Sequence, residues 1–318
     1  EIDRPPVNLR YGKCIIMADQ DHDGSHIIGL LLNLFSHYKP WRQLLDDGFL
    51  QIFITPIIKA RKGRKTQKFF SLEDYQQWHD QEDRSSWHIK YYKGLGTSTA
   101  TEAQECFHDL ENHLVPIFPG ENGDEYMDLA FNKDRAGDRK QFLVHPPRVN
   151  LRPNGFQEFV CGRLFDFYNA NNHRTLPHIM DGLKPTRRKI LYALLIKKSN
   201  EERKVAALAA YVTEQMGYHH GEASLAKTII GMAQTFVGAS NINLLEPEGQ
   251  FGTRSLGGKD AASARYIFTR LASITRLLFP DVDNETFMDH TVLEHQEEEG
   301  KHVEPVHLAP ILPLIFIP

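Results

Sequence analysis

The feature that most limits the fold of this chain is a short apolar run that leads into alternating acidic residues. Residues 13–18 have the length and apolar character of a buried strand. Residues 25–38 carry apolar side chains at helical spacing, with Ser25 as a candidate N-cap. Between these segments stand three aspartates at alternate positions, Asp19, Asp21 and Asp23. A strand, an acidic turn and a helix in this order predict an α/β layer, whose ligands bind beyond the carboxyl ends of the strands.

Strand and helix signals continue to alternate over the first third of the chain. Residues 49–58 and 87–92 are rich in strand-forming residues, and residues 99–114 predict a helix. This alternation predicts a parallel sheet. Prolines and glycines punctuate residues 116–153, which predicts a connecting region with one short helix near residues 126–131.

The second half of the chain reads differently. Residues 154–279 are mostly helical in pattern, with helices predicted at 187–197, 201–216 and 221–237. A length of 318 residues corresponds to about two domains. We therefore expect an α/β domain followed by a domain of helices and a smaller share of strand.

The three aspartates suit a hard cation. Carboxylates at alternate positions just past a strand can converge on one ion, and oxygen ligands suit Mg²⁺, which also binds phosphate oxygens. A calcium loop fits less well, because its twelfth position, counted from Asp19, is Leu30 instead of Glu. The other alternative is an acidic turn that caps the next helix, but three acids exceed what capping requires. The pattern favours a metal site.

The charge pattern limits where nucleic acid could bind. A net charge of −4 excludes a basic field over the whole surface, so a nucleic-acid site must be a local patch. Six Lys or Arg and no acid lie between residues 59 and 68, and nine Lys or Arg against three acids lie between residues 174 and 204. Each segment is either a solvated face or a track for phosphates. Residues 281–304 hold nine acids against Lys301 and predict a solvated surface or linker.

Several classes of protein are excluded by composition. Cys14, Cys106 and Cys161 are far apart and odd in number, which excludes a disulfide scaffold and fits a reducing compartment. No apolar run reaches the ~18 residues of a membrane span. The first residues lack the apolar core of a signal peptide. Because the chain opens with Glu1 and stops inside an apolar stretch, we expect a piece of a larger protein.

Six short motifs stand out in the chain, at residues 15–26, 90–99, 180–185, 218–222, 249–254 and 264–269. They occur in the order found in type IIA DNA topoisomerases of the eukaryotic type, and the chain resembles this family over nearly its whole length. The first matches the family's DxDxD segment, and the second its KYYKGLGTST segment.

The resemblance implies an architecture. We expect a TOPRIM domain with a Rossmann-like parallel sheet over residues 1–115, a connecting region over 116–172, a winged-helix (CAP-like) domain over 173–280 and the start of a tower domain over 281–318. In fold class this is α/β plus α+β.

The resemblance also implies a chemistry. Tyr266 would attack a DNA phosphodiester and form a 5′-phosphotyrosyl link, which conserves the bond energy for resealing. A free phenol, with a pKa near ~10, is protonated at neutral pH, and Arg265 beside it could lower the energy needed to ionise it. His220 is implied in a supporting role, such as proton shuttling, although a polar loop is the plainer interpretation of adjacent histidines. The metal would be Mg²⁺, with Mn²⁺ as a substitute, on the three aspartates.

The implied DNA contacts are a set of basic and loop residues. Glycines that let backbone approach phosphate, a basic helix and a glycine-framed loop make up the set: Lys93, Gly94, Lys184, Arg187, Arg188, Lys189, Gln250 and Arg254. Glu246 and Glu248 depart from the family pattern, in which glutamine and an apolar residue are usual at these positions.

The implied setting is that of a nuclear enzyme, or of a viral or organellar variant, which acts on double-stranded DNA as a homodimer and not at a membrane. ATP would be used by a domain outside this chain, and a TOPRIM glutamate is expected upstream of Glu1. Two alternatives stay open. One is a DNA-binding module that keeps the fold without cleavage; the other is a different TOPRIM enzyme, against which the intact Arg265–Tyr266 pair argues.

Overall fold

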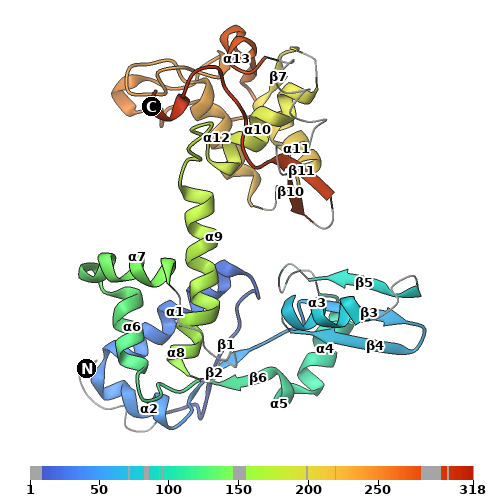
Figure 1. Ribbon diagram of the computed structural model, residues 1–318, viewed down its shortest axis with the longest axis vertical. Helices are drawn as coiled ribbons and strands as arrows, with labels where there is room; N and C mark the ends of the chain where they lie inside the picture. Colours follow the sequence, from blue (N-terminus) through green and yellow to red (C-terminus); the bar gives the residue numbers. More distant parts are fainter. Residues whose placement is uncertain are drawn as a thin grey trace. The chain divides into compact units, whose positions relative to one another are not determined.

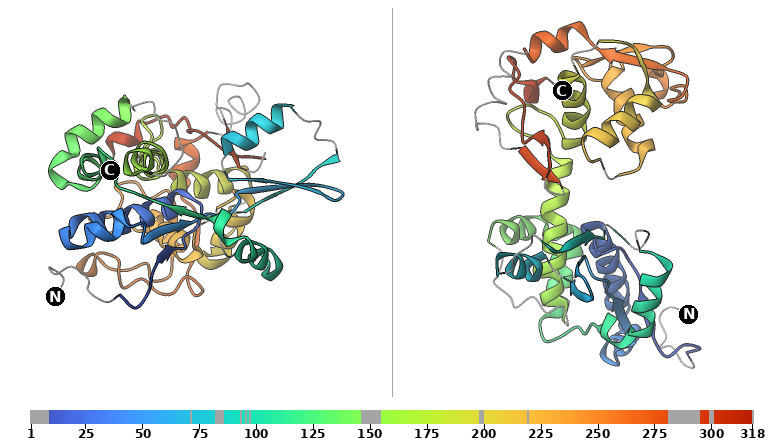
Figure 2. Two further views of the ribbon diagram at one scale, coloured as in Figure 1. Left: turned by 90° about the horizontal axis from the view of Figure 1, so that it is seen from below. Right: turned by 90° about the vertical axis from the view of Figure 1, so that its right-hand side faces the viewer.

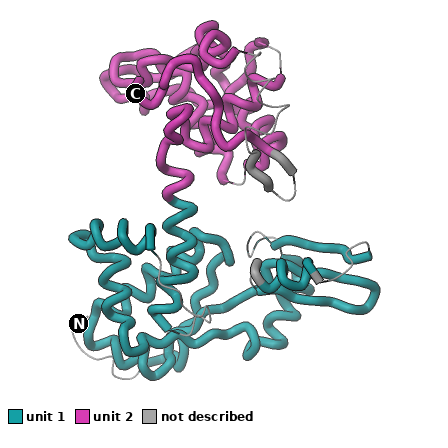
Figure 3. The backbone as a smooth tube through the Cα atoms, in the orientation of Figure 1, with its two compact units in different colours: residues 1–171 teal, residues 172–318 magenta. Residues whose placement is uncertain are grey.

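The computed structural model describes residues 9–70, 72–81, 86–92, 94, 96, 98–145, 155–197, 200–218, 220–280, 295–298 and 301–317. The chain forms two compact units, Glu1–Asn171 and Asn172–Pro318 (Figure 3). Each unit buries its own apolar core. The predicted mixture of helices and small sheets is confirmed.

The first unit is built on the predicted strand–helix–strand segment (Figure 1). Strand β1 (Cys14–Ile16) is followed by helix α1 (His22–His37) and a short helix α2 (Arg42–Asp46). Strand β2 (Leu50–Phe53) then pairs with β1 in parallel, as expected, and all four of its residues are buried. A parallel neighbour requires a crossover of this kind, so α1 packs on the sheet.

The third strand of this sheet corrects the expectation of an all-parallel sheet. Strand β6 (Leu114–Pro116) runs antiparallel to β2. The chain returns to the sheet at the end where β2 stops, since the amide of Ile54 donates to the carbonyl of His113 at 2.8 Å. A strand that enters at that end can pair only in the reverse direction.

A second sheet extends from the first unit (Figures 1 and 2). Strands β3 (Ile58–Lys62), β4 (Lys65–Phe69) and β5 (His88–Tyr91) are antiparallel, with β3 in the centre. The predicted strand over residues 49–58 is thus the end of one sheet and the beginning of another. The apolar side chains of the second sheet form a small core with aromatic residues of helix α3 (Leu72–Gln81).

The remaining helices of the first unit follow the second sheet in the chain. Helices α4 (Ala100–His108) and α5 (Leu110–His113) lead into β6. The segment predicted as a connection forms α6 (Gly123–Phe131) and α7 (Ala136–Val144), of which only the first was expected. Helix α8 (Phe156–Phe159), a π-helical turn (Val160–Leu164) and helix α9 (Phe165–Thr175) complete the set. Residues 146–154 lie outside the described residues.

The second unit joins helices to a three-stranded sheet. Helices α10 (Pro185–Ile196), α11 (Val205–Gln215) and α12 (Glu222–Ala233) contribute most of its core. Strands β7 (Arg203–Lys204), β9 (Phe268–Leu271) and β8 (Leu245–Glu248) form an antiparallel sheet in that order, and α13 (Ser273–Leu278) follows. Strands β10 (His295–Glu298) and β11 (Lys301–Pro305) form a hairpin.

Two further features of the described residues concern the cysteines and the apolar character of the helices. The three cysteines are free thiols, two of them buried. Among the helices that the structure describes, none has the length and apolar character needed to cross a membrane.

We expect Phe159→Ala to destabilise the first unit. The side chain is fully buried in the core around α1, so its removal leaves a cavity and should lower the free energy of unfolding by about 3–5 kcal/mol. Urea denaturation measures this change. Val144→Ala is the control, because Val144 is 67% exposed and its truncation should change the free energy by less than about 0.5 kcal/mol. Equal effects of the two changes would contradict the assignment of the core.

Candidate functional site

The acidic motif lies where β1 ends and α1 begins. Asp21 is the N-cap of α1, in place of the predicted Ser25, and its Oδ1 accepts a hydrogen bond from the amide of Gly24 at 2.7 Å. The hydroxyl of Ser25 donates to the carbonyl of Asp21 at 3.0 Å. Asp23 lies in the first helical turn, where its negative charge interacts favourably with the positive end of the helix dipole. The capping alternative is therefore correct for one of the three aspartates.

The fit of this motif to a metal ion depends on the exposure of the three carboxylates. Asp19 and Asp21 are exposed and Asp23 is half-buried. Within the described ranges, no three His, Cys, Asp or Glu side chains lie together in a way that could hold an ion. Mg²⁺ does not need such a cage, because it usually binds through one or two carboxylates, water and substrate phosphates. The donor set fits Mg²⁺ on that basis, and the cap of the helix uses only the Oδ1 atom of Asp21.

Two glycines allow the backbone to close around Asp19. A Cβ atom on Gly24 would lie 1.9 Å from the carbonyl oxygen of Asp19, so only glycine fits there. A Cβ on Gly94 would lie 2.7 Å from the Oδ1 atom of Asp19. Gly94, which follows β5, thus lies against the carboxylate of Asp19, so the structure brings together residues of two separate sequence motifs.

Glu102 anchors the segments on both sides of that loop. Its carboxylate accepts hydrogen bonds from the Nζ of Lys90 at 2.9 Å, from the hydroxyl of Tyr92, and from the amide of Thr99 at 2.8 Å in a capping box. Desolvation alone would raise the pKa of Glu102, but the hydrogen bonds from Tyr92, Thr99 and Lys90 outweigh it and lower the pKa to about 2. Burial and the contact with Glu102 raise the pKa of Tyr92.

Arg163 is a neighbour of the acidic motif that sequence reasoning missed. Its guanidinium donates to Ser25 Oγ at 3.3 Å and to Gln20 Oε1 at 3.5 Å, and burial lowers its pKa. It lies in the π-helical turn, a distortion that often occurs at functional sites. Because 138 residues separate Arg163 from Ser25, no local pattern could have revealed the contact.

Arg188 corrects the predicted set of DNA contacts. Its side chain is 1% exposed and forms two hydrogen bonds with the carboxylate of Asp181, at 2.7 and 3.1 Å. The same carboxylate accepts from the amides of Leu183 and Leu308, both at 2.9 Å. A Cβ on Gly182 would lie 2.6 Å from the amide nitrogen of Ile315. This motif therefore builds a buried anchor, and Arg188 presents no charge to solvent.

Lys189 was also predicted to contact DNA, and like Arg188 it is buried in an ion pair. It is buried, and its Nζ donates to Glu304 Oε2 at 2.6 Å and to the carbonyl of Met216 at 2.7 Å. Glu304 is 0% exposed, so this member of the acidic segment is not solvated as predicted. The neighbouring Lys184 is exposed and Arg187 is half-buried. Of the basic residues predicted on this helix, these two stay available to a phosphate.

Tyr266 lies on the surface of the second unit. Its side chain is 67% exposed, in the turn that precedes β9, and its amide donates to the carbonyl of Ser263 at 2.9 Å. The guanidinium of Arg265 lies over the phenol ring, 4.9 Å from the centroid. His220 is also exposed and lies near Tyr218 in an edge-on ring contact. The predicted nucleophile is thus accessible, with a positive charge beside it.

The loop before Tyr266 is held by its own hydrogen bonds. Gln250 Oε1 accepts from the amide of Gly252 at 3.1 Å, and Asp260 accepts from the amide and the hydroxyl of Thr253 at 2.8 and 2.9 Å. The amide of Thr253 lowers the pKa of Asp260. Gly252 has a φ of 94° and lies so close to the backbone of residue 258 that a side chain would not fit. Gln250 and Arg254 are both exposed on this ordered loop.

The two glutamates that depart from the family pattern have a cationic partner. Arg270 Nε donates to Glu246 Oε2 at 2.6 Å, and its Nη2 lies 3.5 Å from Glu248 Oε1. The strand pairing of β8 with β9 places Glu246 opposite Arg270. Sequence reasoning missed this arginine, because 24 positions separate it from Glu246 and no tight turn fixes the register of the two strands. Lys93 and His219, by contrast, lie outside the described residues.

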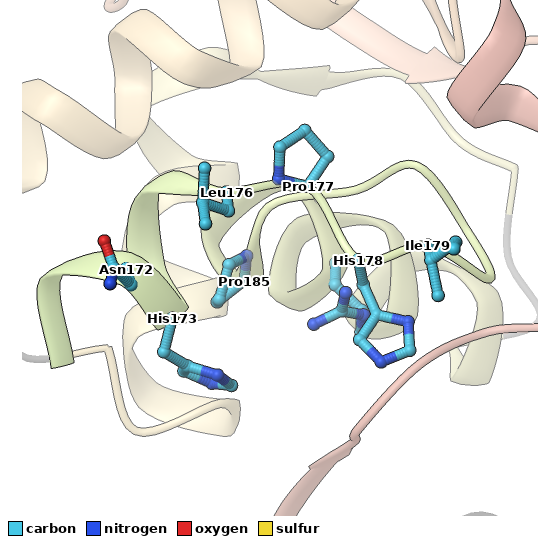
Figure 4. Close-up of a pocket in the computed structure, with 8 residues that line it drawn as sticks. Asn172, His173, Leu176, Pro177, His178, Ile179 and Pro185 are labelled. Atoms are coloured by element: carbon cyan, nitrogen blue, oxygen red, sulfur yellow. The ribbon is translucent and has the colours of Figure 1, made fainter. Parts of the chain in front are cut away.

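A small hollow lies beside the buried anchor of the second unit (Figure 4). Its lining includes His173, His178 and Arg188, and the ring of His178 stacks on His307 with centroids 4.9 Å apart. Burial, followed by the charges of Arg188 and His178, lowers the pKa of His173. Burial, followed by the charge of His178, lowers the pKa of His307. The surroundings of His173 and His307 therefore favour the neutral form of these two side chains.

Two family models match the chain. The model for the C-terminal associated domain of TOPRIM matches residues 53–172, and the model for the A subunit of DNA gyrase/topoisomerase IV matches residues 174–318.

Similar full-length proteins are DNA topoisomerases. The chain is 48% identical over 319 residues to a putative mitochondrial DNA topoisomerase 2 of Caenorhabditis elegans, a match that covers 98% of this chain and 27% of that protein. It is 45% identical to DNA topoisomerase 2-beta of Mus musculus, over 97% of this chain and 20% of that protein. The chain thus spans between a fifth and about a quarter of the length of these relatives.

A solved structure matches the fold. The crystal structure of the Plasmodium falciparum topoisomerase II DNA-binding, cleavage and re-ligation domain superposes with a TM-score of 0.78 at 44% identity. The match covers 98% of this chain and 43% of that one. The family resemblance drawn from the six motifs is confirmed by these comparisons.

We expect Glu102→Gln to destabilise the first unit by about 1–3 kcal/mol at pH 7, because the change weakens hydrogen bonds to a charged acceptor. A carboxylate with a lowered pKa stabilises the fold above its unfolded value, here 4.5, and loses this contribution as the pH falls towards 2. Urea denaturation at pH 7 and pH 3 should therefore show a smaller difference between variant and wild type at pH 3. Glu111→Gln, at an exposed position, is the control, and a difference that grows on acidification would contradict the network.

We expect the second unit to lose stability as the pH falls from 7 towards 5.5. His173 and His307 have lowered pKa values, so the unfolded chain binds more protons in this range. His307→Phe keeps an aromatic ring against His178 but removes one titrating group, and should reduce the slope of unfolding free energy against pH. His220→Phe, at an exposed position, should leave the slope unchanged. An unaltered slope in His307→Phe would contradict the assignment.

Proposed function

Because this chain belongs to the type IIA DNA topoisomerases of the eukaryotic type, we propose that it supplies the centre at which such an enzyme cleaves and reseals DNA. The single observation that carries this proposal is the exposed phenol of Tyr266 with the Arg265 guanidinium on its ring. An accessible tyrosine can reach a phosphodiester, and the positive charge beside it can stabilise the negative charge that develops on the phosphoryl group during attack.

In the proposed reaction, the Oη atom of Tyr266 attacks a DNA phosphorus in line. The Oη–P bond forms as the P–O3′ bond breaks, so the protein becomes linked to a 5′-phosphate and a 3′-hydroxyl is released. The phenol gives up one proton and O3′ takes up one, and His220 is the candidate to move a proton. Arg265 stabilises the phosphoryl charge. Resealing reverses these steps and needs no separate energy source.

The acidic motif supplies the metal-binding part of the centre. Asp19, Asp21 and Asp23 would hold a Mg²⁺ ion, or Mn²⁺ in its place, and the Oδ1 atom of Asp21 also fixes the start of the helix that carries Asp23. When bound, the ion would supply positive charge that stabilises the oxygen leaving phosphorus. Gly94 lies close to the carboxylate of Asp19.

The proposed contacts to double-stranded DNA are the predicted residues that remain on the surface. Lys184, Arg187 and Arg254 would bind phosphates, and Gln250 lies in the same ordered loop as Arg254. Lys93 keeps its predicted place in this set. Contacts of this kind position duplex DNA without reading its sequence.

The wider activity needs parts outside this chain. We propose a homodimer in which ATP, used by another domain, drives passage of one duplex through the break in a second, which relaxes supercoils. The relatives support a nuclear or organellar setting, since one of them is named as mitochondrial.

We expect Tyr266→Phe in the full-length protein to abolish the covalent protein–DNA adduct and to leave DNA binding unchanged. The phenol oxygen forms the bond to phosphorus, and phenylalanine keeps the ring against Arg265. Denaturant trapping with 5′-labelled and 3′-labelled duplex in the presence of Mg²⁺ measures the adduct and its polarity.

The matched control for this experiment is Tyr11→Phe, a tyrosine that is 75% exposed in the first unit. It should form the adduct at the wild-type level. A normal adduct in the Tyr266 variant would remove Tyr266 from the nucleophilic role. Loss of the adduct in both variants would show that the assay reports folding instead of chemistry.

A further inference from the structure

The hairpin of β3 and β4 carries a concentration of positive charge that the proposed cleavage centre does not use. Its tip is a two-residue turn, Gly63 and Arg64, and the strands on both sides of the turn run outward from the first unit (Figures 1 and 2). Between residues 61 and 67 the side chains are Arg, Lys, Thr and Gln around one glycine, and all of them are exposed. We refer to residues 59–68 as the basic hairpin.

The strand register places like charges opposite one another. Lys62 pairs with Lys65 across the turn, and Lys59 lies opposite both Lys68 on β4 and Lys90 on β5. Like charges at directly opposed positions destabilise a sheet. The hairpin therefore carries an electrostatic penalty that a structural role alone does not explain.

Among the described residues, the neutralising partners lie at the base of the hairpin. Lys59 lies 3.2 Å from Glu105, and Lys90 pairs with Glu102, both on α4. Nearer the tip, Lys62 lies over the ring of Trp87 at 5.8 Å. Within the described part of the chain, Arg61, Arg64 and Lys65 have no carboxylate at ion-pair distance. The charge of the tip is thus left for an external partner.

Protection against aggregation does not account for this pattern. Lysines on an edge strand prevent sheets from pairing with one another. Strand β4 is an edge strand, but Arg61 on β3 is paired on both sides, with Thr66 on β4 and with His88 on β5. Charge on a central strand does not block an edge.

We propose that the basic hairpin binds the phosphate backbone of duplex DNA, as a contact additional to the cleavage centre. The proposal rests on the function proposed above, since it assigns a second contact to the same substrate. A tip of Lys and Arg matches a polyanion with one charge per ~1.7 Å of its axis. An acidic protein is a poorer match, because residues 61–67 offer no apolar or aromatic anchor of the kind that protein interfaces use. Flexible cations without a reading helix also predict contact that is independent of base sequence.

The test uses the full-length protein with Tyr266→Phe, so that binding is measured without cleavage. Arg61, Arg64 and Lys65 are changed to Gln together, and the affinity for duplex DNA is titrated between 50 and 200 mM salt. Each phosphate contact contributes about 0.9 to the slope of log K against log salt, so the triple variant should lower the slope by up to about 3. The matched control changes Lys39, Lys133 and Lys140 to Gln, three exposed lysines elsewhere in the first unit, and should keep the slope.

A second readout separates binding from folding. The triple variant removes Lys65 from its position opposite Lys62, and Arg61 and Arg64 are exposed, so the melting temperature should stay unchanged or rise while DNA binding weakens. A lower melting temperature with an unchanged slope would overturn the proposal, and so would an equal loss of slope in the control. Unchanged duplex binding with loss of poly-glutamate binding would assign the hairpin to an acidic protein and also overturn it. Failure of the hairpin leaves the Tyr266 adduct intact, so the two proposals can fail separately.

Discussion

The second unit depends on one buried charge pair. The Asp181 carboxylate binds the Arg188 guanidinium and two backbone amides, with both side chains excluded from water. Removal of one partner would leave an uncompensated charge in the interior, which typically destabilises a protein by about 3–5 kcal/mol. This pair fixes the start of α10, the turn before it and the segment around Leu308.

Burial is what the sequence could not reveal about the basic residues. Arg187, Arg188 and Lys189 are equivalent in a charge count, yet the structure leaves one partly at the surface and pairs the other two inside. The partner of Arg188 is seven positions away and could have been suspected, but that of Lys189 is 115 positions away. A pattern of charges reports which residues are cationic, and only the fold decides which of them meet solvent.

Local patterns predicted the beginning of the first unit. The strand, acidic turn, helix and second strand around residues 13–53 follow from apolar periodicity and appear in the structure. Strand β6 was not predicted, and its pairing, the helix over residues 136–144 and the contact between Gly94 and Asp19 depend on where the chain returns, which no window of sequence contains. The acidic motif shows both cases, because Asp21 obeys a local capping rule while the surroundings of Asp19 come from distant segments.

Residues 304–311 return to the core of the second unit, and this return has a consequence for the evolution of the chain. The chain leaves the core at Phe279 and is fastened again by Glu304 on Lys189, by the amide of Leu308 on Asp181, and by the amide of Ile311 on the carbonyl of Leu278. Since both stems are clamped to one core, the stretch between them can lengthen or shorten with little effect on what lies beneath, each doubling adding only about 0.6 kcal/mol of closure entropy. Such a position can accept insertions during evolution. Additional segments or domains can be gained or exchanged there while the core contacts of the second unit stay the same.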